Sequence, residues 1–274
     1  MIRYLILVVF LVCCSTEVFA IHPYKDYVAV PSQAGMTYDS LNLHAKDNVR
    51  LTGWYCKPAV DTLHLLIVLA GGDAGNMSYD VPLAQFIVQN FQVPVLLFDY
   101  RGFGTSDAFA YDSNAIGHPE YLTDFDAAVS YAKSKYAAKK IVIYGRSMGA
   151  SLALVEASMT SEIIGVIAES PYARQDSLAA RFEAENPSRV VKPIVSDKLE
   201  PWKHIRDFRA KNLLILHGAS EKYIFSGELQ ELLQAAPVSN KKFIDFPGCD
   251  HLELPFKAPQ QLGDAMASFL TQCE

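Results

Sequence analysis

The chain alternates short, uninterrupted runs of apolar residues with longer stretches in which apolar residues recur at helical spacing. Continuous apolar runs of this kind suit strands that are buried on both faces of a sheet. The stretches between them carry an apolar stripe, as expected for helices that cover a sheet. The pattern predicts strands at residues 65–70, 93–98, 140–144, 163–168, 213–216 and 242–246, and helices at residues 81–90, 119–136, 150–159, 227–235 and 259–270.

A hairpin precedes this alternation. Residues 36–45 and 49–56 resemble two strands joined by a turn at residues 46–48. Strands that alternate with helices after an initial hairpin indicate a mostly parallel sheet with helices on both faces. Hydrophobic residues make up 50% of the 274-residue chain, which is enough for one sizeable core. We therefore expect an α/β fold in which residues 21–274 form one domain around an eight-stranded sheet.

Residues 171–209 interrupt the alternation. They contain several prolines, many charged residues, and aromatic residues such as Phe182 and Trp202. The segment is too short for a second domain of its own. We interpret it as a short insertion that lies over the sheet as a lid.

A Gly-x-Ser-x-Gly pattern occupies residues 145–149, directly after one predicted strand and before a predicted helix. In this context the pattern places the serine on a sharp, strained turn at the end of the sheet. The glycines let neighbouring backbone pass closely, and the new helix offers its N-terminal N–H groups to a developing oxyanion. Ser147 is therefore the candidate nucleophile.

A serine nucleophile needs a base, and the base needs a carboxylate that orients it. Glu221 and His251 follow Ser147 in the chain, each in a loop after a predicted strand, which gives the order serine, acid, histidine. His217 is a rival base, but it stands within a strand end and is expected to be structural. Asp250 is a rival acid, but adjacent side chains diverge, so we expect it to point away from His251.

An oxyanion hole needs two N–H groups close to the nucleophile. The small, flexible loop at residues 71–76 follows an early strand and could supply one of them. We predict that the N–H groups of Asp73 and Met148 are the two donors.

Five segments taken in order resemble the alpha/beta-hydrolase superfamily: residues 71–76, 99–106, 145–149, 217–224 and 248–251. The segments Asp-Tyr-Arg-Gly-Phe-Gly and Glu-Ser-Pro, at residues 99–104 and 169–171, are most similar to its short-lid branch. That branch includes bacterial exported hydrolases and eukaryotic membrane-associated protein depalmitoylases. The resemblance implies a serine hydrolase that acts on esters, thioesters or amides.

Two departures from the family pattern bear on catalysis. The family usually has His-Gly before the oxyanion residue, where this chain has Gly71 and Gly72. It usually has asparagine at the oxyanion position and aspartate as the acid, where this chain has Asp73 and Glu221. A carboxylate at position 73 opposes a nearby oxyanion unless it turns away.

We therefore expect an esterase or thioesterase that works through an acyl-enzyme without metal or cofactor. The alternatives are a serine peptidase or amidase, and a binding protein that kept the fold without catalysis. The expected partner is a small-molecule or acyl substrate. A nucleic-acid partner is not expected, because the net charge is −6 and no basic stripe is present.

The first twenty residues read as a secretory signal peptide. Arg3 gives a positive start, an apolar run follows, and small residues lead to a cleavage position after Ala20. The run is shorter than the roughly 20 residues that a membrane span requires. We expect a periplasmic or secreted protein, and as a second interpretation a lipoprotein anchored to the membrane through Cys14.

Cleavage after Ala20 leaves Cys56, Cys249 and Cys273, an odd number that fits poorly with a disulfide framework. Cys249 should stay a free thiol, because Cys56 and Cys273 are expected at the opposite end of the sheet. No cysteines and histidines have the spacing of a zinc site, so no metal is expected.

Overall fold

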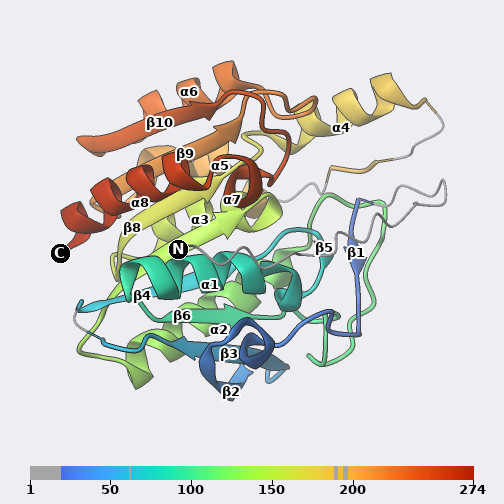
Figure 1. Cartoon of the computed structure of the whole chain (residues 1–274). Coiled ribbons are helices and arrows are strands. Elements are labelled where there is room, and N and C mark those ends of the chain that lie inside the picture. The colour runs from blue at the N-terminus through green and yellow to red at the C-terminus, as the bar shows by residue number, and fades with distance from the viewer. Residues whose placement is uncertain (1–19, 62, 188–190, 194–196) are drawn as a thin grey trace.

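The computed structural model describes residues 20–61, 63–187, 191–193 and 197–274, and within these residues the centre is an eight-stranded sheet (Figure 1). Its strands are β2 (Thr37–His44), β3 (Arg50–Lys57), β4 (Leu65–Ala70), β6 (Val95–Phe98), β7 (Lys140–Arg146), β8 (Ile163–Glu169), β9 (Asn212–Gly218) and β10 (Asn240–Phe246). They lie in the order β10-β9-β8-β7-β4-β6-β3-β2. The predicted α/β architecture is confirmed.

The strands are parallel except at one edge. Strand β3 pairs antiparallel with both β2 and β6, and the other neighbours pair in parallel. The carboxyl ends of β4, β7, β8, β9 and β10 therefore meet at one end of the sheet, where open α/β sheets gather their functional loops. All six residues of β4 are buried, which explains its uninterrupted apolar sequence.

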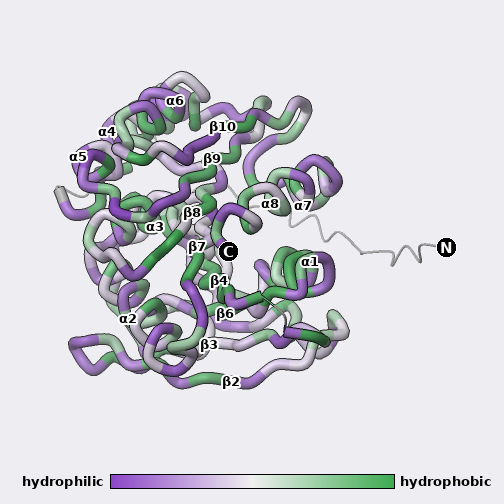
Figure 2. Tube along the Cα trace, turned by 90° about the vertical axis from the view of Figure 1, so that its left-hand side faces the viewer, coloured by the Kyte–Doolittle hydropathy of each residue, from purple (hydrophilic) through white to green (hydrophobic). Residues whose placement is uncertain are grey.

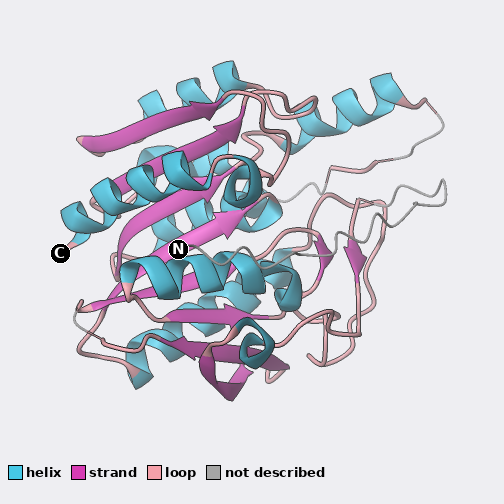
Figure 3. Ribbon diagram, viewed as in Figure 1, coloured by secondary structure: helices cyan, strands magenta, loops and turns pink. Residues whose placement is uncertain are grey.

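Helices cover both faces of the sheet (Figures 2 and 3). One face carries α1 (Val81–Phe91), α7 (Leu254–Lys257) and α8 (Pro259–Cys273), and the other carries α2 (Pro119–Lys135), α3 (Met148–Met159) and α6 (Ser226–Ala235). Each face has its own buried apolar cluster. Proline stands in the first turn of α1, α2 and α8, where its missing N–H costs nothing.

A second, two-stranded sheet was not predicted. It pairs β1 (His22–Pro23) in parallel with β5 (Ala74–Gly75). Two residues are too few to produce a recognisable hydrophobic pattern. The pairing attaches the start of the described chain to the loop that follows β4.

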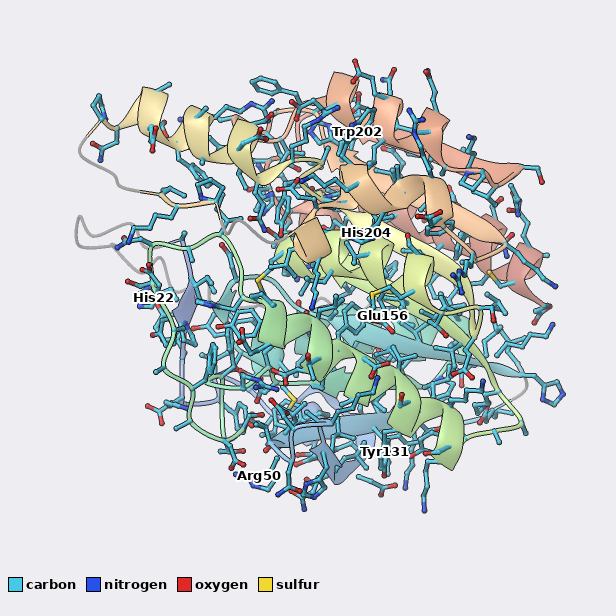
Figure 4. All side chains as sticks on the ribbon, turned by 180° about the vertical axis from the view of Figure 1, so that it is seen from behind. His22, Arg50, Tyr131, Glu156, Trp202 and His204 are labelled. Carbon is cyan, nitrogen blue, oxygen red and sulfur yellow. The ribbon has the colours of Figure 1, made fainter. Side chains whose placement is uncertain are left out.

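Among the described residues between β8 and β9 are two α-helices, α4 (Gln175–Glu185) and α5 (Pro201–His204). The short helix α5 packs against α3 on the face of the sheet seen in Figure 4, where Trp202 and His204 of α5 and Glu156 of α3 are labelled. Helix α4 instead extends past the carboxyl ends of the strands (Figure 1). That placement is compatible with the lid interpretation, which stays a prediction.

The predicted signal peptide and the alternative anchor residue Cys14 lie outside the described residues, apart from Ala20. Within the described ranges no helix has the length and apolar character needed to cross a membrane.

Candidate active site

The proposed nucleophile lies at the sharp turn between β7 and α3. Ser147 has φ 52° and ψ −119°, a backbone conformation that non-glycine residues rarely adopt. Its N–H donates to the carbonyl of Glu169 on the neighbouring strand at 2.9 Å. The strained turn is held by the sheet and presents the hydroxyl at the carboxyl end of the strands, as the motif predicts.

Both glycines of the motif stand where no side chain fits. A Cβ at Gly145 would lie 2.4 Å from the carbonyl oxygen of Gly149. A Cβ at Gly149 would lie 2.3 Å from the carbonyl oxygen of Ala70 at the end of β4. The contacts are with backbone atoms, so a side-chain rearrangement cannot relieve them.

Three side chains from distant parts of the chain meet at this turn. His251 Nε2 lies 3.0 Å from Ser147 Oγ, and His251 Nδ1 lies 2.9 Å from Glu221 Oε2. Glu221 comes from the loop after β9 and His251 from the loop after β10, as predicted. The arrangement has the geometry of a serine nucleophile, a base and an orienting acid.

The second oxygen of the acid is also bonded. Glu221 Oε1 accepts hydrogen bonds from the N–H of Gly218, at 3.1 Å, and from the hydroxyl of Ser170. The carboxylate is almost fully buried, with a side-chain exposure of 2%, whereas the histidine side chain is 41% exposed. The base is thus open to the cavity while its partner is enclosed.

Electrostatics favour the ionised pair. Burial acts to raise the pKa of Glu221, but hydrogen bonds and charge from His251, together with the Ser170 hydroxyl, lower it below its ordinary value. Burial acts to lower the pKa of His251, but the hydrogen bond and charge of Glu221 raise it. The carboxylate therefore stabilises a protonated imidazole, which a general base must become during the reaction.

The two rival residues have other contacts. His217 is buried, with Nδ1 2.6 Å from Asp245 Oδ1 and Nε2 3.0 Å from the carbonyl oxygen of Ile224. Asp250 Oδ1 accepts the backbone N–H of His251 at 2.7 Å, which differs from a contact with the ring. The structure thus brings together Ser147, Glu221 and His251 and leaves the rivals out.

The predicted oxyanion donors flank the nucleophile. Met148 is the first residue of α3, where N–H groups have no partner within the helix. The loop after β4 passes beside the serine, since a Cβ at Gly72 would lie 3.5 Å from Ser147 Cβ. Asp73 lines the same cavity, and its carbonyl accepts the N–H of His22 at 2.8 Å. The donor role of both N–H groups stays a prediction.

A cavity of about 410 Å³ opens at the nucleophile. Its polar lining includes Asp73, Asp250 and Lys222 beside the three central residues. Its apolar lining comes from several distant segments: Ala20, Ile116, Met148, Tyr172, Leu178, Phe182 and Ile224. Such a mixture, mostly apolar with a few converging polar groups, is typical of small-molecule sites.

Arg146 is the variable residue directly before the serine of the motif. No structural or catalytic role was predicted for it. Its buried guanidinium donates to Asp80 Oδ1 at 2.6 Å, to Glu169 Oε2 at 3.1 Å and to the carbonyl of Leu252 at 2.9 Å. It therefore links the strand that carries Ser147 to the residue that follows His251. The sequence offers no signal for this role, because it depends on contacts between four separate segments.

The Asp-Tyr-Arg-Gly-Phe-Gly segment serves the scaffold. Buried Arg101 pairs with Asp124 of α2, at 2.7 Å, and with Asp47 of the first hairpin, at 2.6 Å. These contacts tie the loop after β6 to a helix and to the edge strands. None of the three residues lines the cavity at Ser147.

In the described part of the chain Cys56, Cys249 and Cys273 are all free and buried, which confirms the prediction for Cys249. The described residues contain no group of three or more His, Cys, Asp or Glu side chains arranged to hold a metal ion.

A family model described as serine aminopeptidase, S33, matches residues 65–206, just over half of the chain. A relative called an uncharacterized membrane protein, YNL320W of Saccharomyces cerevisiae, is 26% identical over 234 residues, which is 83% of this chain and 78% of the relative. The alpha/beta hydrolase domain-containing protein WAV2 of Arabidopsis thaliana is 21% identical over 248 residues, 84% of this chain and 77% of its own.

Solved structures share the fold. The esterase Pf2001 of Pyrococcus furiosus superposes with a TM-score of 0.74 at 20% identity, over 92% of this chain and 97% of that one. XC6422 of Xanthomonas campestris, described as a serine hydrolase without lid, gives 0.61 at 16% identity, over 86% and 94%. The predicted alpha/beta-hydrolase fold is thereby confirmed.

Proposed function

This chain belongs to the family described as serine aminopeptidase, S33, within the alpha/beta-hydrolase superfamily, and from that membership we propose that it is a serine hydrolase that cleaves carboxylic esters or thioesters. The observation that carries the proposal is the chain of contacts from Ser147 Oγ to His251, at 3.0 Å, and from His251 to Glu221, at 2.9 Å. A buried carboxylate, an accessible imidazole and a strained serine at one cavity are the parts that acyl transfer requires.

The reaction proceeds in two halves. His251 Nε2 accepts the proton of Ser147 Oγ as that oxygen attacks the substrate carbonyl, and Glu221 stabilises the imidazolium. His251 then gives the proton to the departing alcohol or thiol, which leaves an acyl group on Ser147. In the second half His251 takes a proton from water, the hydroxide attacks the acyl carbonyl, and the proton returns to Ser147 as the acid leaves.

The cavity favours an apolar acyl group. Leu178 and Phe182 of α4 line one side of it, and Ile116 and Ile224 contribute further apolar surface. Each buried methylene contributes about 0.8 kcal/mol, so an acyl chain that fills this space is bound better than acetate. That the chain belongs to the short-lid branch of the superfamily stays a prediction from the sequence.

A panel of p-nitrophenyl esters of increasing acyl length tests the proposal. Wild type should hydrolyse the panel with a preference for chains longer than acetate, and Ser147→Ala should lose several orders of magnitude in kcat. Ser134→Ala, at an exposed position on α2, is a matched control and should be unchanged. Equal rates for wild type and Ser147→Ala would contradict the proposal.

Amide hydrolysis is a second candidate, because the description of the matching family names aminopeptidases. The same nucleophile and base serve both reactions. Aminoacyl p-nitroanilides added to the panel separate the two: a higher kcat/KM for these amides than for the esters would favour the peptidase.

We further propose that the protein is exported and that residues 1–20 are removed. The support is the sequence pattern of a charged start, an apolar run and small residues before Ile21. Cleavage after Ala20 would also remove that residue from the lining of the cavity. Attachment to a membrane through Cys14 is the alternative form of the same proposal.

A further inference from the structure

Ser170 follows β8 and does not line the cavity, yet it contacts the proposed acid directly. It is fully buried. Its hydroxyl donates to Glu221 Oε1, the oxygen that faces away from His251, and its N–H donates to the carbonyl of Leu216 at 2.8 Å. The preceding residue, Glu169, accepts the N–H of Ser147 at 2.9 Å. Two adjacent residues thus contact the nucleophile and the acid.

The backbone of Ser170 is strained. Its φ is 55°, and in the described chain the other non-glycine residues with positive φ are Asn48, Gln92, Ser147 and Leu252. Asn48 and Gln92 stand at a turn and a helix end, where such a conformation is common. The other three, Ser147, Ser170 and Leu252, lie around the proposed active site. Such strain costs about 1–3 kcal/mol and persists where the surrounding structure requires it.

Glycine would relieve this strain, but it would have no hydroxyl. A glutamate side chain has one more rotatable bond than aspartate, so it needs an additional contact to keep one oxygen on the histidine ring. The Ser170 hydroxyl and the Gly218 N–H supply that contact by binding Oε1. Oε2 is then left for His251 Nδ1, at 2.9 Å.

We propose that Ser170 is a positioning residue, whose hydroxyl fixes the orientation of Glu221 and through it the tautomer and charge of His251. The inference rests on the proposed function for its meaning in catalysis, but the contact itself does not depend on a substrate. The lowered pKa of Glu221 agrees with it: burial opposes the shift, and the hydrogen bonds from His251 and Ser170 produce it.

Two substitutions separate the effect of the Ser170 hydroxyl from that of its strained backbone. Ser170→Gly removes both the hydroxyl and the strain, and Ser170→Ala removes the hydroxyl alone. Both variants should lose about ten- to hundredfold in kcat, the cost of a hydrogen bond to a charged group, with little change in KM. Ser170→Gly should nevertheless lose less thermal stability than Ser170→Ala, because glycine also relieves the strained backbone. Asn48→Gly, at an exposed turn, is the matched control for relief of strain and should keep full activity.

An NMR titration of His251 gives a readout that needs no substrate. The negative charges that raise the pKa of His251 are those of Glu221, Asp73 and Glu169, and all of them remain in the variants. Loss of the Ser170 hydroxyl frees Glu221 to leave the ring, so the pKa of His251 should fall from its raised value in both variants.

Unchanged kcat and an unchanged His251 titration in folded Ser170→Gly or Ser170→Ala would overturn the inference. Failure of the proposed function has a different signature, because Ser147→Ala would then match wild type while the His251 titration still decides the role of Ser170.

Discussion

The amide variant Glu221→Gln should abolish most activity, and the structure specifies why. In wild type, Glu221 Oε1 accepts two donors, the Gly218 N–H and the Ser170 hydroxyl, and Oε2 accepts His251 Nδ1–H at 2.9 Å. Glutamine has only one oxygen. Because two donors converge on the Oε1 position, the amide oxygen should stay there and the NH₂ group should face the histidine ring.

This orientation reverses the tautomer of His251. Nδ1 must then accept a hydrogen bond, so the proton moves to Nε2, the nitrogen that lies 3.0 Å from Ser147 Oγ. A protonated Nε2 cannot accept the serine proton. In a related triad the same acid-to-amide change reduces kcat by about 10⁴, and we expect a loss of that order here.

Steady-state kinetics on the best ester of the panel, with circular dichroism to confirm folding, measures the effect. Glu221→Asp should lose less, since the charge stays and the arm shortens by one methylene. Asp250→Asn is the matched control, because Asp250 Oδ1 accepts a backbone N–H and an amide oxygen can do the same. If Asp250→Asn were the damaging change and Glu221→Gln nearly silent, the assignment of the acid would be wrong.

Four further predictions concern the turn, the pH dependence of activity, the pH dependence of stability and the N-terminus. Gly149→Ala should destabilise the fold by about 3 kcal/mol or more, because its Cβ would lie 2.3 Å from a carbonyl oxygen of β4; an unchanged denaturation midpoint would refute this. On the acid side of the pH profile, kcat/KM should be half-maximal at a pH above 6.5, the ordinary pKa of histidine, because the pKa of His251 is raised and only its neutral form can act as base. A midpoint below 6.5 would contradict this. The stability that Glu221 contributes should be present above pH 4.5 and be lost as the pH falls through its lowered pKa, which acid denaturation of wild type against Glu221→Gln measures. Mass spectrometry of the exported protein should find a chain that starts at Ile21, and a lipid-modified cysteine within residues 1–20 would favour the anchor instead.

Much of the scaffold was predictable because the central strands carry continuous apolar runs. The strand at residues 65–70 was predicted with the bounds that the structure gives. Strand β7 continues two residues beyond its apolar run, to Arg146, because ladder pairing with β8 holds the chain extended up to the turn. Hydrophobicity alone carries no signal for that extension.

The convergence of Ser147, Glu221 and His251 was predictable, because the Gly-x-Ser-x-Gly motif and the order serine, acid, histidine can be recognised in the sequence. The residues that support them were not. Ser170 acts through a side-chain contact across 51 positions, and Arg146 through contacts with three other segments. Both lie in segments that the sequence singled out, yet their partners are defined only by the packing of the loops at the end of the sheet.

The most direct test that Ser147 is an activated nucleophile is covalent labelling with a fluorophosphonate, followed by peptide mapping. The reagent reports an activated serine and does not require knowledge of the substrate. One adduct is expected in the wild type, on Ser147, and none in Ser147→Ala. A folded wild type that stays unlabelled, or an adduct on another serine, would contradict it.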